Sequence, residues 1–276
     1  KNKNPPMTPS PSLFDLTGRV AMVTGGGGSL GSAICEGLAR AGAAVVVVDM
    51  AGANGETVAA RIRAAGGRAD ALAVDVSKEK DVAALFAKFD KLHPALDILV
   101  NGISAPVERF QPEDVPLASW QHMLNTNLTG YFLCLQEAGR RMIARGQGGS
   151  IINIGSIGGM NALGRGAISY GVAKAGVGQL TRETALAWAR HKIRVNALLP
   201  CQFTNSWWEA RMADPACKAS NEQVLRGIPM GRLGRPEEMV GPVLFLASSA
   251  SSMVTGALLP VDGGNLALNA GGSVFW

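Results

Sequence analysis

The sequence has few histidines, few cysteines and no long apolar run, and each shortage argues against a class of protein. The three histidines are isolated and lack the spacing of a metal-binding cluster, so we expect no metal site. The four cysteines show no CxxC spacing, which indicates free thiols in a reducing compartment and predicts a cytoplasmic protein. No apolar run reaches the roughly 18 residues of a transmembrane helix, so we expect no membrane span.

Charged residues are also sparse, at 17% of the chain against 47% hydrophobic residues, which favours a sizeable folded core. The net charge of +5 comes from scattered basic residues, and no short window is dominated by them, so we expect no nucleic-acid partner. The opening residues 1–12, KNKNPPMTPSPS, carry charge without an apolar segment. They are interpreted as a disordered or vector-derived leader rather than a signal peptide.

Strand-like apolar runs alternate with helix-like patterns along most of the chain. The run at 43–48 is continuously apolar, as in a parallel strand covered on both faces. Other expected strands lie at 19–23, 68–74, 96–100, 150–154, 194–199 and 258–261, and expected helices at 30–40, 55–65, 81–91, 120–145, 170–190 and 236–247. This alternation predicts one α/β domain over residues 13–265, a doubly wound, Rossmann-type parallel sheet with helices on both faces.

The stretch TGGGGSLG, from Thr24 to Gly31, joins the first expected strand to the first expected helix. A flexible connector would not be held between two core elements, so the turn is interpreted as a phosphate cradle at a helix N-terminus. Ser29 falls at or near the N-cap, where its hydroxyl would cap a backbone N–H or reach a phosphate. Gly28 is the residue expected to have a positive φ.

Asp49 closes the second expected strand, about twenty residues after the glycines, where a carboxylate can accept hydrogen bonds from an adenosine ribose. The 2′-phosphate of NADP would place negative charge against it. The flanking residues of the turn and strand include no Arg or Lys to compensate. The predicted cofactor is therefore NAD.

Tyr170 and Lys174 lie four residues apart, hence on one face of a helix. A cation near a phenol favours the phenolate and lowers its pKa, which gives a usable general acid or base. Ser156, after the strand at 150–154, could orient a carbonyl group. Asn127 is a polar residue within a helical pattern, where asparagine is otherwise unfavourable.

These features together resemble the short-chain dehydrogenases/reductases, over about residues 13–265. The matching motifs are TGGGGSLG, Asp75-Val76, Asn101, the NxxG of 127–130, Ser156, the YxxxK pair and the segment from RLGRPEE to PVDGG. The resemblance implies that Tyr170 exchanges a proton with the substrate oxygen, that Ser156 holds this oxygen, that Lys174 binds the nicotinamide ribose and lowers the tyrosine pKa, and that Asn127 anchors a water. The expected cofactor residues are Gly25, Gly28, Ser29, Leu30, Gly31, Asp49, Asp75, Val76, Asn101, Tyr170, Lys174, Pro200, Cys201 and Thr204.

Three segments depart from the family pattern. The family's NNAG is replaced by Asn101-Gly-Ile-Ser104, and its PG after the sixth strand by Pro200-Cys201, which puts a side chain where the nicotinamide region should pass. Thr204 is the candidate for the threonine that usually follows and contacts the carboxamide. The end of the chain, 266–276, has no family counterpart and is interpreted as a subunit contact or a cap over a neighbouring site.

The expected activity is interconversion of a secondary alcohol and its ketone, with a sugar, polyol or small hydroxy compound as the small-molecule substrate. A 3-oxoacyl thioester reductase and a catalytically inactive dinucleotide-binding regulatory protein remain the alternatives. Residues 202–228 are expected to form a substrate lid, and apolar patterning on more than one face of two helices, together with the resemblance, predicts a homotetramer. The candidate substrate contacts are Ser156, Tyr170, Trp207, Trp208 and Arg165, with Arg109 beside them as a further candidate for binding a carboxylate.

Overall fold

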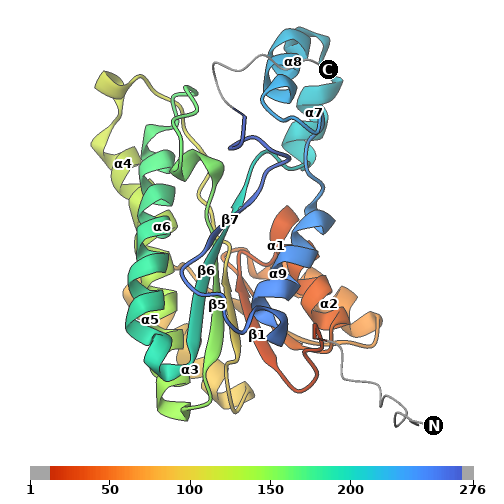
Figure 1. Ribbon diagram of the computed structural model, residues 1–276, viewed down its shortest axis with the longest axis vertical. Coiled ribbons are helices and arrows are strands. Elements are labelled where there is room, and N and C mark those ends of the chain that lie inside the picture. Colours follow the sequence, from red (N-terminus) through yellow and green to blue (C-terminus); the bar gives the residue numbers. More distant parts are fainter. Residues whose placement is uncertain (1–12, 269–276) are drawn as a thin grey trace, which may run out of the picture.

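Seven parallel strands form the centre of the computed structural model, which describes residues 13–268 (Figure 1). Their order in the sheet is β3-β2-β1-β4-β5-β6-β7, so the chain reverses its direction of winding between β1 and β4. The expected strands are all present, with ends shifted by at most two residues. They are β1 Val20–Thr24, β2 Ala44–Asp49, β3 Arg68–Ala73, β4 Ile98–Asn101, β5 Gly149–Ile154, β6 Ile193–Pro200 and β7 Leu258–Val261.

Helices cover both faces of the sheet, as the alternating pattern predicts (Figure 1). On one face, α1 (Ser29–Arg40), α2 (Gly52–Ala64) and α9 (Val240–Ala247) pack on Val23 and the other side chains that the strands direct to that side. On the opposite face, α3 (Glu79–Leu92), α5 (Gly130–Arg145) and α6 (Ile168–Trp188) pack on Met22 and its neighbours. The doubly wound fold class is confirmed.

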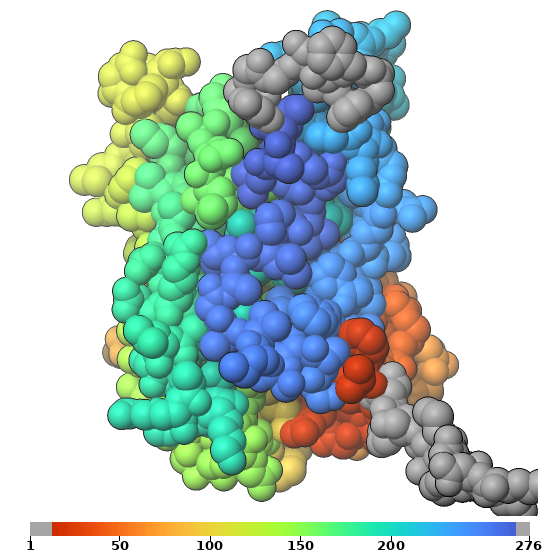
Figure 2. Space-filling model, viewed as in Figure 1, coloured from red at the N-terminus to blue at the C-terminus, as the bar shows by residue number. Residues whose placement is uncertain are grey.

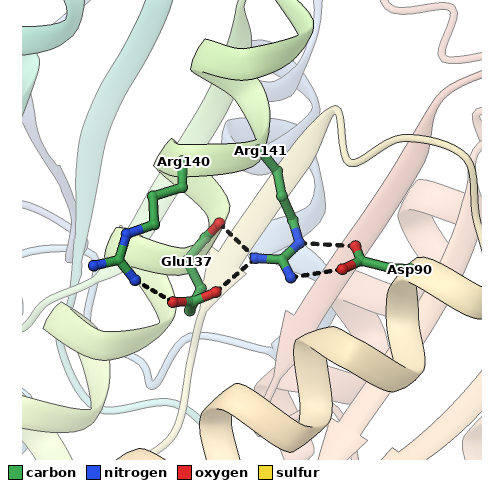
Figure 3. Close-up of polar contacts among 4 residues, drawn as sticks. All are labelled: Asp90, Glu137, Arg140 and Arg141. Carbon is green, nitrogen blue, oxygen red and sulfur yellow. Dashed lines mark hydrogen bonds and ion pairs between the residues drawn. The ribbon is translucent and has the colours of Figure 1, made fainter.

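A network of ion pairs joins α3 to α5 at the edge of the second helical layer (Figure 3). The Arg141 guanidinium donates to both carboxylate oxygens of Asp90, at 2.8 and 2.7 Å, and to the Glu137 carboxylate at 2.6 Å. Glu137 also accepts from Arg140. Arg141 lies over the Phe86 ring, 4.8 Å from its centroid, so the network continues into apolar packing. These contacts fix the position of α5 against α3.

Two segments differ from the pattern expected of the sequence. The expected helix at 120–145 is divided into α4 (Leu117–Leu124), a π-helical turn (Asn125–Thr129) and α5. The segment expected to form a lid contains two helices, α7 (Ser206–Ala213) and α8 (Lys218–Arg226), which lie above the sheet in Figure 1. Short 3₁₀ turns lie at Pro112–Asp114, Ile157–Gly159, Ala189–His191, Pro215–Cys217, Pro236–Met239 and Ser249–Ser251.

Strand β7 forms one edge of the sheet. The segment that carries it runs along the surface between α6 and α9, in dark blue in Figure 2. Its last described residues turn back on Asp262, whose carboxylate accepts from the Gly264 and Leu266 amides. The expected leader at 1–12 and most of the expected tail contact, from 269 on, lie outside the described residues.

Within residues 13–268, no helix is both long and apolar enough to cross a bilayer. The same part of the chain contains no group of three or more His, Cys, Asp or Glu residues placed to hold a metal ion.

Candidate active site

The carboxyl ends of four neighbouring strands, β2, β1, β4 and β5, meet at one edge of the sheet. Thr24 at the end of β1 pairs with Val48, next to Asp49 on β2, and with Asn101 on β4, which pairs with Asn153 on β5. The reversal between β1 and β4 lies at this edge, where open α/β sheets bind their ligands.

The glycine turn after β1 is tightly packed. Gly25 has a φ of +72°, and a Cβ there would lie 2.8 Å from the Gly102 carbonyl oxygen. A Cβ on Gly31 would lie 2.0 Å from the Gly25 carbonyl oxygen. Glycine is therefore required at both positions, and the turn is a fixed cradle rather than a flexible connector. The prediction of a positive φ at Gly28 was wrong: its φ is −80°, and Gly25 makes the left-handed bend instead.

Ser29 is the first residue of α1, not its cap. Gly28 occupies the N-cap position, and no side chain caps the helix. The Ser29 hydroxyl instead donates to the Thr204 carbonyl oxygen at 3.2 Å, which brings the loop after β6 against the glycine turn. Leu30, the next residue of the helix, packs on the core.

Asp49 lies directly beside the glycine turn. Its Oδ2 accepts from the Gly27 amide at 3.0 Å, and its Oδ1 accepts from the Ala51 amide at 3.1 Å. Each carboxylate oxygen therefore has one backbone donor and retains lone pairs for a further donor. The carboxylate also supports the cradle that it adjoins.

Asp75 and Val76 follow β3 at the same edge. The Asp75 carboxylate accepts from the Ser77 hydroxyl at 2.6 Å and pairs with Lys78 at 3.1 Å. The hydrogen bond from Ser77 holds the pKa of Asp75 below its ordinary value, against the opposing effect of burial. Val76 is buried against Gly130, where any larger residue would collide with it.

Tyr170 and Lys174 lie on α6, and the Lys174 Nζ is 5.8 Å from the centroid of the Tyr170 ring. Ser156 follows β5 and accepts from the Gly158 amide at 3.1 Å. Burial raises the pKa of Tyr170 above its ordinary value, and a hydrogen bond with the Ser156 side chain opposes the rise. Phenol, hydroxyl and amine are thus gathered beside the strand ends.

The Lys174 amine is buried, 3% exposed, and donates to the Tyr131 hydroxyl and to the Ile154 carbonyl oxygen, both at 2.8 Å. Burial lowers the pKa of Lys174 to about 7. The expected lowering of the tyrosine pKa by Lys174 is therefore not found here. The net direction for the pKa of Tyr170 is upward, because the effect of burial outweighs that of the hydrogen bond with Ser156.

Asn127 lies in the π-helical turn between α4 and α5 and is fully buried. Its side-chain oxygen accepts from the Ala105 amide at 2.8 Å, and its nitrogen donates to the Ser104 hydroxyl at 3.4 Å and to the Met123 sulfur at 3.1 Å. Asn127 thus fixes the loop after β4. Its role in anchoring a water stays a prediction.

Two buried oxygens at this edge have no hydrogen-bond partner among the described residues, Asn101 Oδ1 and Gln202 Oε1. The Asn101 nitrogen donates to Asn153 at 3.0 Å. Gln202 follows Pro200-Cys201 on the loop beyond β6, where the Thr204 amide donates to Gly234 at 2.8 Å. The Cys201 thiol is partly buried beside Gln202, and burial raises its pKa to about 11, so this thiol is mostly protonated at neutral pH.

Besides Ser156 and Tyr170, the candidate substrate residues are Trp207 and Trp208 on the lid helix α7, Arg165 in the loop before α6 and Arg109 in the segment after β4. Arg211 on α7 lies over Trp207 and Trp208, 5.5 and 5.9 Å from their rings, and donates to Ser220 on α8. The tryptophans therefore pack within the lid, with Trp207 still 54% exposed. On the other side, Arg109 donates to the Arg165 carbonyl oxygen at 2.8 Å, and burial lowers the pKa of Arg165.

Tyr131 is the residue of this site that sequence reasoning missed. Its side chain is buried, as its place in an apolar helical pattern suggests, but its hydroxyl contacts Lys174. The sequence signal was its rarity, since the chain has only two tyrosines and the other is Tyr170.

The fold and the site define a dinucleotide-dependent oxidoreductase, and comparison with known proteins agrees. Residues 25–265 match a family model described as enoyl-(acyl carrier protein) reductase. The chain belongs to the short-chain dehydrogenase/reductase family. It is an oxidoreductase of the kind that acts on CH–OH groups, like the dehydrogenases that it matches.

Relatives match along almost their whole length. The cis-4-hydroxycyclohexanecarboxylate dehydrogenase of Sinomonas cyclohexanicum is 39% identical, over 91% of this chain and 97% of its own. The NAD-dependent glycerol dehydrogenase of Listeria innocua is 36% identical, over 91% and 95%. The structure of a gluconate 5-dehydrogenase from Burkholderia cenocepacia, in complex with NADP and tartrate, superposes with a TM-score of 0.81 at 37% identity, covering 93% of this chain and 98% of that one.

The residues at the strand ends fit a nicotinamide dinucleotide. The glycine turn leaves no room for a Cβ at Gly25 or Gly31 and opens into the N-terminus of α1, which suits a pyrophosphate. Asp49 has acceptor capacity for ribose hydroxyls, and Gln202 Oε1 is an unpartnered buried acceptor on the loop expected near a carboxamide.

Proposed function

We propose that the protein is an NAD(H)-dependent oxidoreductase that interconverts a secondary alcohol and its ketone, with Tyr170 as general acid and base. One observation carries the proposal: Tyr170 and Lys174 lie one turn apart on α6, with Ser156 after β5 in hydrogen-bonding reach of the phenol, at the end of the sheet where the glycine turn follows β1. When bound, the cofactor would supply or accept the hydride. Asn127, Ser156, Tyr170 and Lys174 form the proposed catalytic set.

In this proposal Ser156 orients the substrate oxygen and Tyr170 moves a proton to or from it. Lys174 holds the cofactor and adjusts the charge near the phenol. As Lys174 gains a proton below a pH of about 7, its positive charge favours the Tyr170 phenolate, and as it loses the proton that support is withdrawn. Because burial already raises the pKa of Tyr170, the oxidation of an alcohol should be faster at alkaline pH.

The preference for NAD over NADP rests on Asp49. Its carboxylate borders the cradle, and the residues that contact it there, Gly27 and Ala51, carry no positive charge. A 2′-phosphate would meet this negative charge in a partly dry crevice. The relatives use both dinucleotides, since one is named NAD-dependent and another was solved with NADP, so Asp49 is the discriminating feature.

The proposed substrate is a small polyhydroxy or hydroxy-acid compound. Arg165 and Arg109 lie together, and Arg165 is half-buried, so a substrate carboxylate would find a guanidinium already drawn out of water. Two relatives are named for substrates that carry a carboxylate, hydroxycyclohexanecarboxylate and gluconate. Trp207 and Trp208 would form the apolar wall of the lid.

A 3-oxoacyl thioester reductase is the second candidate, favoured by the acyl-carrier wording of the matching family model. A regulatory protein without turnover is the third, and the complete catalytic set argues against it. The proposal also includes a cytoplasmic location, in keeping with four free cysteines.

We propose further that the protein is a homotetramer. The outer side of α6 exposes Ile168, Val172 and Leu186, by 39%, 44% and 81%, and α5 beside it exposes Phe132 by 42%. Apolar side chains gathered on two adjacent helices would be covered by a second copy.

Initial rates of NAD⁺ reduction across polyols, aldonic and hydroxy acids, and simple secondary alcohols test the proposed function, with 3-oxoacyl thioester reduction by NADH assayed in parallel. The proposal expects turnover with a polyol or hydroxy acid, and a loss of activity on acids in Arg165→Ala but not on neutral polyols. Turnover of the thioester alone would favour the second candidate, and binding of NADH with no turnover of any compound would favour the third.

A further inference from the structure

Both tyrosines of the chain contact the same lysine. Tyr170 precedes Lys174 by one turn on α6, while Tyr131 reaches it from the first turn of α5. The Tyr131 side chain is 2% exposed, and the Lys174 Nζ lies 4.5 Å from the centroid of its ring. The lysine amine is therefore enclosed between two phenols.

The Tyr131 hydroxyl is held at a defined point. It accepts a hydrogen bond from the Lys174 Nζ at 2.8 Å, and it lies 2.9 Å from the Ile103 carbonyl oxygen and 3.0 Å from that of Ile154, to one of which it donates. Burial raises the pKa of Tyr131 well above its ordinary value, so the hydroxyl stays protonated and can act as donor and acceptor at once.

An ammonium has three donors, and the structure accounts for two of those on Lys174, given to Tyr131 and to the Ile154 carbonyl oxygen. The third is left for the cofactor ribose or for Tyr170. The side-chain amide of Asn127 contacts Ala105, Ser104 and Met123, and its expected connection with Lys174 through a water stays a prediction. The direct polar contact of Lys174 on the α5 side comes from Tyr131.

We propose that Tyr131 is a positioning residue for the dehydrogenase reaction: its hydroxyl, placed at the Ile103 and Ile154 carbonyl oxygens, holds the Lys174 ammonium beside the Ile154 carbonyl and directs the remaining donor of that ammonium toward Tyr170 and the cofactor. The inference rests on the proposed function of Tyr170 and Lys174. Tyr131 has no assigned contact with substrate and acts through Lys174 alone.

The groups that surround the Lys174 amine determine how loss of the Tyr131 hydroxyl would change the charge of Lys174 and the ionisation of Tyr170. Tyr170 lies beside it on α6, Tyr131 faces it from α5, and among the described residues Tyr170 and Cys134 are the ionisable groups that raise the pKa of Tyr131. Loss of the Tyr131 hydroxyl removes an acceptor from the ammonium, which disfavours its charged form. With less positive charge nearby, the Tyr170 phenolate is also less favoured.

Tyr131→Phe keeps the ring and removes only the hydroxyl. We expect kcat to fall about tenfold at pH 7, where the Lys174 amine is still partly charged, as for the loss of one hydrogen bond to a charged group, with little change in the KM for substrate. The rise of kcat/KM with pH in the oxidation direction should move to higher pH by about one unit. Ser150→Ala is the matched control, because it removes a buried hydroxyl that donates to the Leu246 carbonyl at the opposite end of β5.

A second measurement uses the protein labelled with 3-fluorotyrosine, in which the two tyrosines give two fluorine signals. In the Tyr170→Phe background the remaining signal belongs to Tyr131. It should shift as Lys174 loses its proton, and this shift should disappear in Tyr170→Phe/Lys174→Met but persist in Tyr170→Phe/Ser150→Ala. This readout stands even if Tyr131→Phe fails to fold.

A Tyr131→Phe enzyme with the rate and pH profile of the parent would overturn the inference. So would a Tyr131 fluorine signal whose shift with pH is the same with and without Lys174. Full activity in Tyr170→Phe would instead remove the proposed function on which the inference rests. The two failures are thus distinguishable.

Discussion

Lys174 contacts one hydroxyl and one carbonyl oxygen, neither of which carries a charge. Burial therefore acts on its pKa without the compensation of an acidic partner at those contacts, and the pKa falls to about 7. Tyr170 responds to the same dry surroundings in the opposite sense, because its charged form is the anion. In this residue pair, desolvation lowers the pKa of the amine toward neutral pH and raises the pKa of the phenol further above it.

The residue-scale prediction concerns Asp49 and the choice of dinucleotide. We expect NAD(H) to be preferred over NADP(H) by about 100-fold in kcat/KM, equivalent to roughly 2.7 kcal/mol. Asp49→Ala should reduce this ratio of kcat/KM values, mainly by raising kcat/KM for NADPH, because the repulsion of the 2′-phosphate is removed. Steady-state kinetics with both dinucleotides measure this.

Two further variants separate the charge of Asp49 from its support of the turn. Asp49→Asn keeps an acceptor for the Gly27 amide and should also reduce the preference for NAD(H) over NADP(H). Asp70→Ala removes a carboxylate from the neighbouring strand β3 and should leave the preference unchanged. A parent enzyme that uses NADPH as well as NADH would show that the role of Asp49 has been misread.

The elements that apolar runs define could be predicted from sequence, and those that polar contacts define could not. The valine-rich β2 was found within one residue, because a continuous apolar run has few other solutions in an α/β chain. Helices α7 and α8 were not among the expected helices of the lid segment, because most of their residues are exposed and Trp207 and Arg211 pack on each other. The π-helical turn at Asn127 gave no periodic signal of its own.

The same distinction holds within the site. The residues of the glycine turn and of the YxxxK pair are fixed by local spacing, so sequence alone could name them. The contact of Ser29 with Thr204, and that of Tyr131 with Lys174, join segments far apart in the chain. No local pattern indicates these contacts, which is why Ser29 was expected to cap a backbone N–H or reach a phosphate, and why Tyr131 was not identified.

The element-scale prediction concerns the first turn of α1. In Gly31→Ala, the new Cβ would lie 2.0 Å from the Gly25 carbonyl oxygen, so the cradle must move. We expect the free energy of unfolding to fall by about 1–3 kcal/mol and the affinity for NADH to fall more than tenfold. Thermal melts and fluorescence titration with NADH measure the two effects.

Gly241→Ala is the matched control, since Gly241 lies on α9 with open space around its missing Cβ. It should leave NADH affinity unchanged and stabilise the helix by about 0.5 kcal/mol. Normal NADH affinity in Gly31→Ala would contradict the assignment of this turn as the pyrophosphate cradle.

At the scale of the whole molecule, the outer faces of α5 and α6 expose several large apolar side chains to solvent. Leu186 is 81% exposed on the same side of α6 as Val172, and Phe132 adds to the apolar area from α5. Sedimentation at micromolar concentration should give a tetramer, because association removes these side chains from water. Leu186→Glu should shift the protein to smaller species.

Leu92→Glu serves as the control, since Leu92 is 52% exposed at the end of α3, outside the two helices that carry the proposed contact surface. It should leave the sedimentation coefficient unchanged. A parent protein that sediments as a stable monomer would refute the proposed assembly without affecting the chemistry of the single subunit.

The central claim is that the Tyr170 hydroxyl moves the proton of the reaction. Tyr170→Phe removes that hydroxyl and leaves the glycine turn, Asp49 and Lys174 in place. Turnover of the best substrate from the panel and NADH affinity by fluorescence titration should be measured on the same preparation. We predict that kcat falls by a factor on the order of 10³ or more while the affinity for NADH changes less than about threefold. A Tyr170→Phe protein that binds NADH and turns over at the rate of the parent would contradict the account.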